Sequence, residues 1–123
     1  MQDFNKKTEV EYNHGAEDYV KQRDEIPFYQ CVEIPSTLKI IGSLNGKSCL
    51  DLACGTGVYP RLYKKHNASK VVGIDISDAM IDIAKSYEQE NKQDIQYTAA
   101  DVLNMGHIDN FDIITGIQCI LLE

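Results

Sequence analysis

Apolar positions change their spacing near residue 45, from helical repeats to short continuous runs. Before that point the pattern predicts two helical pieces, the first of which is marked by the apolar and aromatic residues Tyr12, Tyr19 and Val20. The second piece spans residues 28–41, where Pro35 is expected to interrupt the helix. The chain is therefore predicted to have an N-terminal helical cap over residues 1–45 and an α/β domain over residues 46–123.

Four apolar runs in the second part predict strands that alternate with helix-length segments. The predicted strands are residues 49–53, 70–75, 94–99 and 111–117. Ser77 predicts the N-cap of a helix whose apolar residues, at helical spacing, are Met80, Ile83, Ala84 and Tyr87. Strands separated in this way pair in parallel through right-handed crossovers. The pattern thus predicts an α/β fold with a doubly wound, mostly parallel sheet, whose ligands bind at the carboxyl ends of the strands.

A glycine-rich turn follows the first predicted strand. Gly55 and Gly57 allow the backbone to turn sharply and to come close to a ligand. Asp75 ends the second strand 20 residues after Gly55, where an acid can accept hydrogen bonds from the hydroxyls of an adenosine ribose. Asp75 could also be a turn residue before Ser77, but its pairing with the glycine loop favours ligand binding. As a strand-end side chain, it is expected to contribute little to the packing of the fold.

The residues around the loop distinguish between classes of nucleotide ligand. A dinucleotide fingerprint has Gly or Ala at the last position of G-x-G-x-x-G, and Pro60 occupies that position here, so NAD is disfavoured. Residues 42–48 (GSLNGKS) have one residue too few between their glycines for a phosphate-binding loop, and they precede a strand instead of following one. Phosphate recognition of that type is excluded.

Three motifs resemble those of class I S-adenosylmethionine (SAM) dependent methyltransferases, in the order and at the spacing of that family. They are residues 50–57 (LDLACGTG), 73–77 (GIDIS) and 100–102 (ADV). Residues 111–114 (FDII) are similar to the family's fourth strand, so the resemblance covers residues 46–122. It implies a Rossmann-like methyltransferase fold that binds SAM. Because the complete fold of this family has seven strands, the resemblance also predicts a domain that is truncated after strand four.

The resemblance implies which residues contact SAM. These are Asp51, Ala53, Gly55, Gly57, Asp75, Ile76, Asp101 and Val102. In the family the glycine loop lies against the methionyl part, and the acid that matches Asp75 holds the ribose. The positions of Asp101 and Val102 meet adenine through a carboxylate and a backbone N–H.

Two of these candidates have an alternative interpretation. Asp51 matches the family's acid that is linked to the methionyl amino group, directly or through water, but it could instead cap the loop. Ile76 could pack on the adenine or belong to the apolar core. SAM carries a sulfonium and an ammonium group but no phosphate, so it suits a loop flanked by Asp51 and Asp75.

The implied activity is methyl transfer from SAM to a small molecule, with a protein as the less favoured acceptor. Residues 115–119 (TGIQC) lack the Asn/Asp-Pro-Pro-aromatic signature of family members that methylate nucleobase amino groups. A net charge of −7 also has the wrong sign to attract nucleic acid. Two alternatives stay open: a noncatalytic SAM-binding or interaction module, and an NAD-binding Rossmann domain. The sequence assigns no catalytic residue.

The remaining features bear on location, metals and assembly. Residues 1–12 are polar and no apolar run approaches membrane-spanning length, so a cytoplasmic protein without a membrane partner is expected. The four cysteines have no C-x-x-C spacing and no histidine at zinc-binding distance in the sequence, which predicts reduced thiols and no metal site. The fourth predicted strand is apolar and free of Lys and Pro, so its edge is a possible site of self-association.

Overall fold

The computed structural model describes residues 29–106 and 108–117 of the 123-residue chain. The first predicted helical piece, around Tyr12, lies outside the described residues. In chain order the elements are η1 (Tyr29–Glu33), α2 (Ile34–Ile41), β1 (Ser48–Leu52), α3 (Val58–Lys65), β2 (Lys70–Asp75), α4 (Asp78–Glu90), β3 (Ile95–Ala99), η2 (Val102–Asn104) and β4 (Ile113–Thr115). The second strand has the predicted bounds, and η2 lies between the third and fourth strands.

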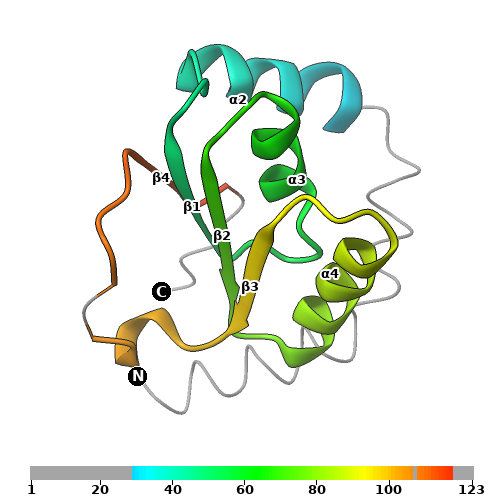
Figure 1. The fold of residues 1–123 in the computed structure, drawn as a ribbon, viewed down its shortest axis with the longest axis vertical. Helices are drawn as coiled ribbons and strands as arrows, with labels where there is room; N and C mark the ends of the chain where they lie inside the picture. The colour runs from blue at the N-terminus through cyan, green and yellow to red at the C-terminus, as the bar shows by residue number, and fades with distance from the viewer. Residues whose placement is uncertain (1–28, 107, 118–123) are drawn as a thin grey trace.

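The four described strands form one parallel sheet in the order β3-β2-β1-β4 (Figure 1). From β1 the chain builds the sheet in both directions, with β2 and β3 on one side and β4 on the other. This arrangement confirms the predicted doubly wound α/β fold. Because all four strands run the same way, their carboxyl ends lie at one edge of the sheet, where ligands of such folds bind.

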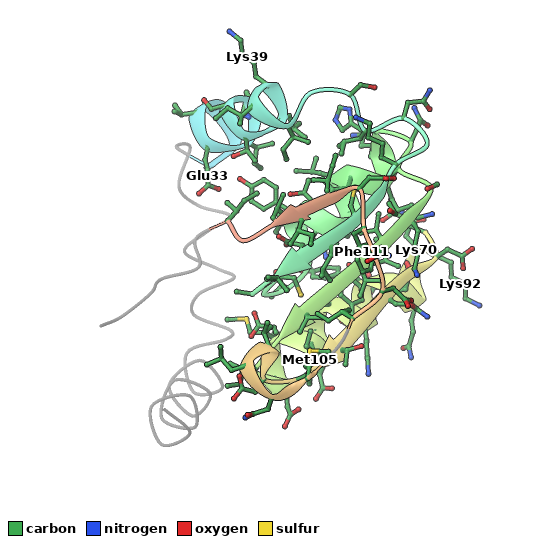
Figure 2. All side chains as sticks on the ribbon, turned by 90° about the vertical axis from the view of Figure 1, so that its left-hand side faces the viewer. Glu33, Lys39, Lys70, Lys92, Met105 and Phe111 are labelled. Carbon is green, nitrogen blue, oxygen red and sulfur yellow. The ribbon has the colours of Figure 1, made fainter. Side chains whose placement is uncertain are left out.

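Side chains from alternate strand positions form two apolar layers, one on each face of the sheet. The first layer contains residues of α2, α3 and α4, and its fully buried members include Cys49, Tyr63, Val71, Ile81 and Ala84. The second layer contains strand residues Leu50, Val72 and Ile74. The connection between β3 and β4 covers that second face with Met105, Ile108 and Phe111 (Figure 2). Both faces of the two central strands are therefore shielded from water.

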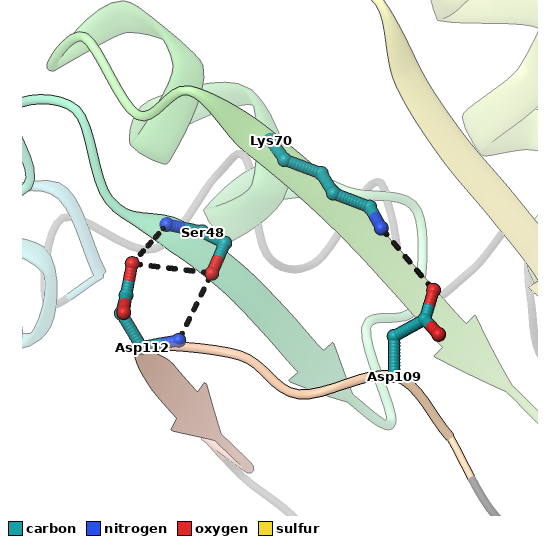
Figure 3. A network of polar contacts seen from close by, with 4 residues as sticks. All are labelled: Ser48, Lys70, Asp109 and Asp112. Carbon is teal, nitrogen blue, oxygen red and sulfur yellow. Dashed lines mark hydrogen bonds and ion pairs between the residues drawn. The ribbon is translucent and has the colours of Figure 1, made fainter.

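A polar cluster ties the start of β4 to the start of β1 (Figure 3). The backbone N–H and the hydroxyl of Ser48 donate to Asp112 Oδ2 at 2.9 and 3.2 Å, and the Asp112 N–H donates to Ser48 Oγ at 2.9 Å. These two donors of Ser48 lower the pKa of Asp112. Lys70 pairs with Asp109 at 3.4 Å and lies 5.3 Å from the centroid of the Phe111 ring. The cluster holds the β3–β4 connection at the end of the sheet opposite to the carboxyl ends.

The helical piece before the sheet changes type next to Pro35, because the π-helical turn η1 ends at Glu33 and α2 begins at Ile34. Pro35 lies in the first turn of α2, where its missing backbone N–H is tolerated, so the predicted interruption falls at the boundary between η1 and α2. The predicted strand that differs most from the structure is the fourth. The fourth strand has three residues where the pattern predicted residues 111–117. Phe111 packs on the second face of the sheet and Asp112 bonds to Ser48, so neither residue continues the β4 ladder.

The buried face of α4 is also rotated from its prediction. Met80 and Ala84 are buried as expected, but the third buried residue is Ile81, whereas Ile83 is half-buried and Tyr87 is exposed. The Arg61 guanidinium lies 4.4 Å from the centroid of the Tyr87 ring, so Tyr87 faces a cation of α3 and not the core.

The predicted N-cap of α4 is confirmed, since Ser77 Oγ accepts from the Met80 N–H at 3.2 Å and Ser77 is fully buried. We expect Ser77→Ala to lower the free energy of unfolding by about 1–2 kcal/mol, because a buried N–H loses its acceptor. Urea denaturation measures the loss. Ser86→Ala is the matched control, because Ser86 is an exposed serine of the same helix. A loss at Ser77 no larger than that at Ser86 would contradict the capping role.

Candidate functional site

The predicted site residues lie at the carboxyl edge of the sheet. Asp51 is the fourth of the five residues of β1, Asp75 ends β2, and Asp101 follows β3 by two residues. The Ala100 N–H donates to the Asp75 carbonyl at 2.9 Å, which continues the β2–β3 ladder past the end of β3. The three acidic segments are therefore held on neighbouring strands.

The glycine loop contains three residues in the left-handed conformation: Ala53 with φ 55°, Gly55 with φ 59° and Gly57 with φ 88°. Among the described residues, no atom lies within 4 Å of a Cβ added at Gly55, so this position is open to a ligand. Gly57 is buried, and a Cβ there would lie 2.8 Å from Cζ of Tyr97. Gly57 is thus required by packing against Tyr97, a constraint that sequence analysis did not find.

Arg61 holds the same loop from α3. Its Nη1 donates to the Thr56 carbonyl at 2.5 Å, and its backbone N–H donates to the Gly57 carbonyl at 3.0 Å. Burial raises the pKa of Tyr97 to about 12, so the phenol beside the loop stays protonated at neutral pH. Neither Arg61 nor Tyr97 was a sequence candidate, because their contacts depend on how α3 packs against β3.

Asp75 joins β2 to the glycine loop. Its Oδ2 accepts from the Gly55 N–H at 2.8 Å and its Oδ1 from the Ser77 N–H at 2.9 Å, and the residue is only 8% exposed. Burial raises the pKa of Asp75, while the N–H groups of Ser77, Gly55 and Ile76 act in the opposite direction. Asp75 therefore contributes more to the local fold than a strand-end side chain was expected to. An ionised carboxylate has about four acceptor positions, so these backbone bonds do not exhaust it.

Asp51 is held by a residue of β4. The two residues are register partners in the sheet, and the Thr115 hydroxyl donates to Asp51 Oδ1 at 2.7 Å. Asp51 is 2% exposed. Thr115 was not a candidate from the sequence. A hydroxyl residue inside the fourth apolar run was its only sequence signal, and its pairing with Asp51 depends on the register of β4 on β1.

Two buried carboxylates give the loop a negative field. Burial first, and then the charges of Asp75 and Asp51, raise the pKa of the Cys54 thiol, which lies between them in the chain. A thiol in this environment stays protonated. The same field favours a positively charged ligand group and opposes a phosphate. The chemistry of the edge therefore agrees with a cationic ligand.

The residues after β3 form a small capped turn. Asp101 Oδ1 accepts from the Leu103 N–H at 3.0 Å, and its Oδ2 accepts from Asn104 Nδ2 at 2.9 Å. These bonds fix the Asp101 carboxylate within its own turn. Val102 is exposed and Ile76 is half-buried, so both have surface available to a ligand. Their contacts with adenine stay predictions.

The described residues contain neither a metal-binding cluster nor a membrane-spanning helix. In residues 29–106 and 108–117, no three His, Cys, Asp or Glu side chains are grouped so that they could hold a metal ion. No helix in the same part of the chain has the length and apolarity to cross a membrane. Cys31, Cys49 and Cys54 are free thiols, and Cys119 lies outside the described residues.

Several known proteins that are similar to this chain are named as methyltransferases. A family model described as "Methyltransferase domain" matches residues 49–122. The ubiquinone biosynthesis O-methyltransferase of Coxiella burnetii is 37% identical over 82 residues, which cover 66% of this chain and 34% of that protein. The demethylmenaquinone methyltransferase of Lactococcus lactis is 32% identical over 109 residues, covering 85% and 43%.

A solved structure extends the similarity to the fold. The crystal structure of an S-adenosylmethionine dependent methyltransferase from Mesorhizobium loti superposes with a TM-score of 0.61 at 27% identity, over 76% of this chain and 40% of that one. The chain thus spans less than half the length of each of these relatives.

Proposed function

Because this chain belongs to the class I SAM-dependent methyltransferase family, we propose that its carboxyl edge binds SAM as the cofactor-binding part of a methyltransferase. The observation that carries this proposal is the bond from the Gly55 N–H to Asp75 Oδ2 at 2.8 Å. It joins the glycine loop and the strand-end acid into one unit, beside a loop position that is open to a ligand.

The groups at this edge fit SAM. Asp75 would accept hydrogen bonds from the ribose hydroxyls with lone pairs that its backbone donors do not use. The Asp51 charge would attract the ammonium, and the open face of Gly55 would admit the methionyl part. The residues proposed to contact the cofactor are Asp51, Ala53, Gly55, Gly57, Asp75, Ile76, Asp101 and Val102. Gly57 would act through the loop conformation, since Tyr97 occupies the space beside it.

Methyl transfer from SAM requires mainly positioning of the reactants by the protein. When bound, SAM supplies a methyl group activated by its sulfonium. The residues of this chain would orient that group and keep the reacting atoms apart from water, which is the main protein contribution to a direct displacement. A catalytic base is optional, and none is proposed.

We propose a small molecule as the methyl acceptor, with a protein as the alternative. The two curated relatives are named for ubiquinone biosynthesis and for demethylmenaquinone, which supports a small acceptor. The acidic net charge of −7 argues against nucleic acid.

A cytoplasmic location stays a prediction. Self-association through β4 also stays a prediction, which the 59% exposure of Ile114 on that edge strand supports.

Titration calorimetry with three ligands tests the cofactor assignment. We expect SAM and its product S-adenosylhomocysteine to bind one per chain, at least about tenfold more tightly than NAD, because the carboxylates beside the loop repel a pyrophosphate. NAD binding as tight as SAM binding would favour the dinucleotide alternative and contradict the proposal. SAM binding without methyl transfer to any acceptor would favour the noncatalytic module.

A further inference from the structure

Three buried or half-buried side chains form a hydrogen-bonded chain that ends at the site. The Tyr63 hydroxyl of α3 donates to Thr115 Oγ1 of β4 at 2.9 Å, and the Thr115 hydroxyl donates to Asp51 Oδ1 of β1 at 2.7 Å. Tyr63 is fully buried and Thr115 is half-buried. These two hydrogen bonds therefore connect α3, β4 and β1 through side chains alone.

The number of protons that each group can donate fixes the direction of the two hydrogen bonds. An ionised Asp51 can only accept, so the single hydroxyl proton of Thr115 must point toward it. Thr115 Oγ1 then has only lone pairs to offer Tyr63, which must donate. Burial is the main cause that raises the pKa of Tyr63, so its proton stays in place at neutral pH. Each donor is thereby aligned toward the carboxylate.

Two hydroxyl groups that donate in one direction strengthen the hydrogen bond to the Asp51 carboxylate. A bond from a hydroxyl to a carboxylate is stronger than a bond between neutral groups, and the bond from Tyr63 polarises the Thr115 hydroxyl further. Asp51 is thus held in one orientation at the carboxyl edge of β1 by side chains of β4 and α3. A buried carboxylate with a fixed orientation is suited to bind a cation at a fixed place.

We propose that Thr115 and Tyr63 are positioning residues that orient Asp51 toward the ammonium of the methionyl group of SAM. The inference rests on the proposed function, because it assumes that SAM binds at this edge. It goes beyond that function by assigning recognition of the amino-acid part of the cofactor to a side-chain network that includes β4.

Two ligands separate positioning from a general structural role. S-adenosylhomocysteine and 5′-methylthioadenosine both contain adenosine and a neutral sulfur, but only the first has the amino-acid part. We expect Thr115→Val, which replaces the hydroxyl by a methyl group of similar size, to weaken S-adenosylhomocysteine binding about tenfold and to change 5′-methylthioadenosine binding less than about twofold. Thr115→Ser, which keeps the hydroxyl, should retain most of the affinity. Calorimetry on the full chain measures all affinities, and circular dichroism confirms folding.

Tyr63→Phe provides a second variant that removes one oxygen and no other atom. It should weaken S-adenosylhomocysteine binding about threefold, with the same selectivity. Equal losses for both ligands, or unchanged affinity for S-adenosylhomocysteine in folded variants, would overturn the positioning role while the proposed function stands. Failure of the wild-type chain to bind either SAM or S-adenosylhomocysteine would overturn both.

Discussion

Gly57→Val is expected to destabilise the chain by about 2–6 kcal/mol and to abolish SAM binding. Gly57 has φ 88°, a conformation that a β-branched residue strongly disfavours. The new Cβ would also lie 2.8 Å from Cζ and 2.9 Å from Cε1 of the buried Tyr97 ring. Both effects act on the loop that carries Gly55, and the sum is a large part of the usual stability of a domain. Urea denaturation and calorimetric titration with SAM measure the two losses.

Gly55→Ala is the matched control for this prediction. Gly55 has a similar left-handed backbone, with φ 59°, but an added Cβ would meet no atom of residues 29–106 or 108–117 within 4 Å. Alanine there should cost only the backbone strain of about 1–2 kcal/mol. Gly57→Ala would add contact with Tyr97 without branching, so its loss should lie between the other two. A Gly57→Val variant as stable as Gly55→Ala would show that Tyr97 does not constrain the loop.

Asp75→Ala is expected to weaken SAM binding by about a hundredfold or more. Each charge-assisted bond to the ribose is worth about 1.5–3 kcal/mol, so the loss of a single bond weakens binding about ten- to a hundredfold. The structure adds a second effect, because Asp75→Ala also leaves the N–H groups of Gly55 and Ser77 without their acceptor. The variant should therefore lose about 1–3 kcal/mol of stability as well. Calorimetry and urea denaturation measure these effects.

The pH dependence of binding provides a second test of Asp75. Because the pKa of Asp75 is raised, the folded chain should take up this proton at a higher pH than the unfolded chain does. Proton uptake by Asp75 therefore stabilises the folded chain fully at a pH below the pKa of this group in the unfolded chain. That stabilisation is lost as the pH rises through the pKa of Asp75 in the folded chain. SAM affinity should change in the opposite direction, falling as acid protonates the carboxylate. Asp75→Asn should remove that fall, and an unchanged pH profile in this variant would contradict ribose binding by Asp75.

The strands and the cap of α4 were predictable because their signals are local. Residues 71–74 (VVGI) form a short run without polar side chains, and the strand that contains them has the predicted bounds, residues 70–75. Ser77 precedes a helical repeat, and it caps α4 as expected. Parallel pairing followed from the length of the segments between strands. The signals for the strand and the cap lie within a few residues of the element that they predict, and the signal for pairing lies in the segment between two successive strands.

Features that depend on packing between distant elements were not predictable in the same way. The prediction placed Tyr87 on the buried face of α4, whereas in the structure Tyr87 lies against Arg61 of α3, a contact that the spacing within α4 does not reveal. The packing of Tyr97 against Gly57 requires β3 to be placed beside the loop. Likewise, Thr115 acts on Asp51 only through the register of β4 on β1. The sequence located the acids of the site but not the side chains that hold them.

The pairing of β4 with β1 also bears on the order in which the sheet assembles. The Thr115–Asp51 bond joins residues 64 positions apart, whereas β1 meets β2 through residues 48 and 70. Because of chain entropy, closing the longer loop costs about 1 kcal/mol more in free energy. The contacts that can offset this cost come from a strand of only three residues. Among the described strands, β4 is therefore expected to join last during folding and to exchange its amide hydrogens first in the native state. Since Thr115 belongs to this strand, occupancy of the Asp51 site is expected to favour the closed sheet and to slow the local opening of β4.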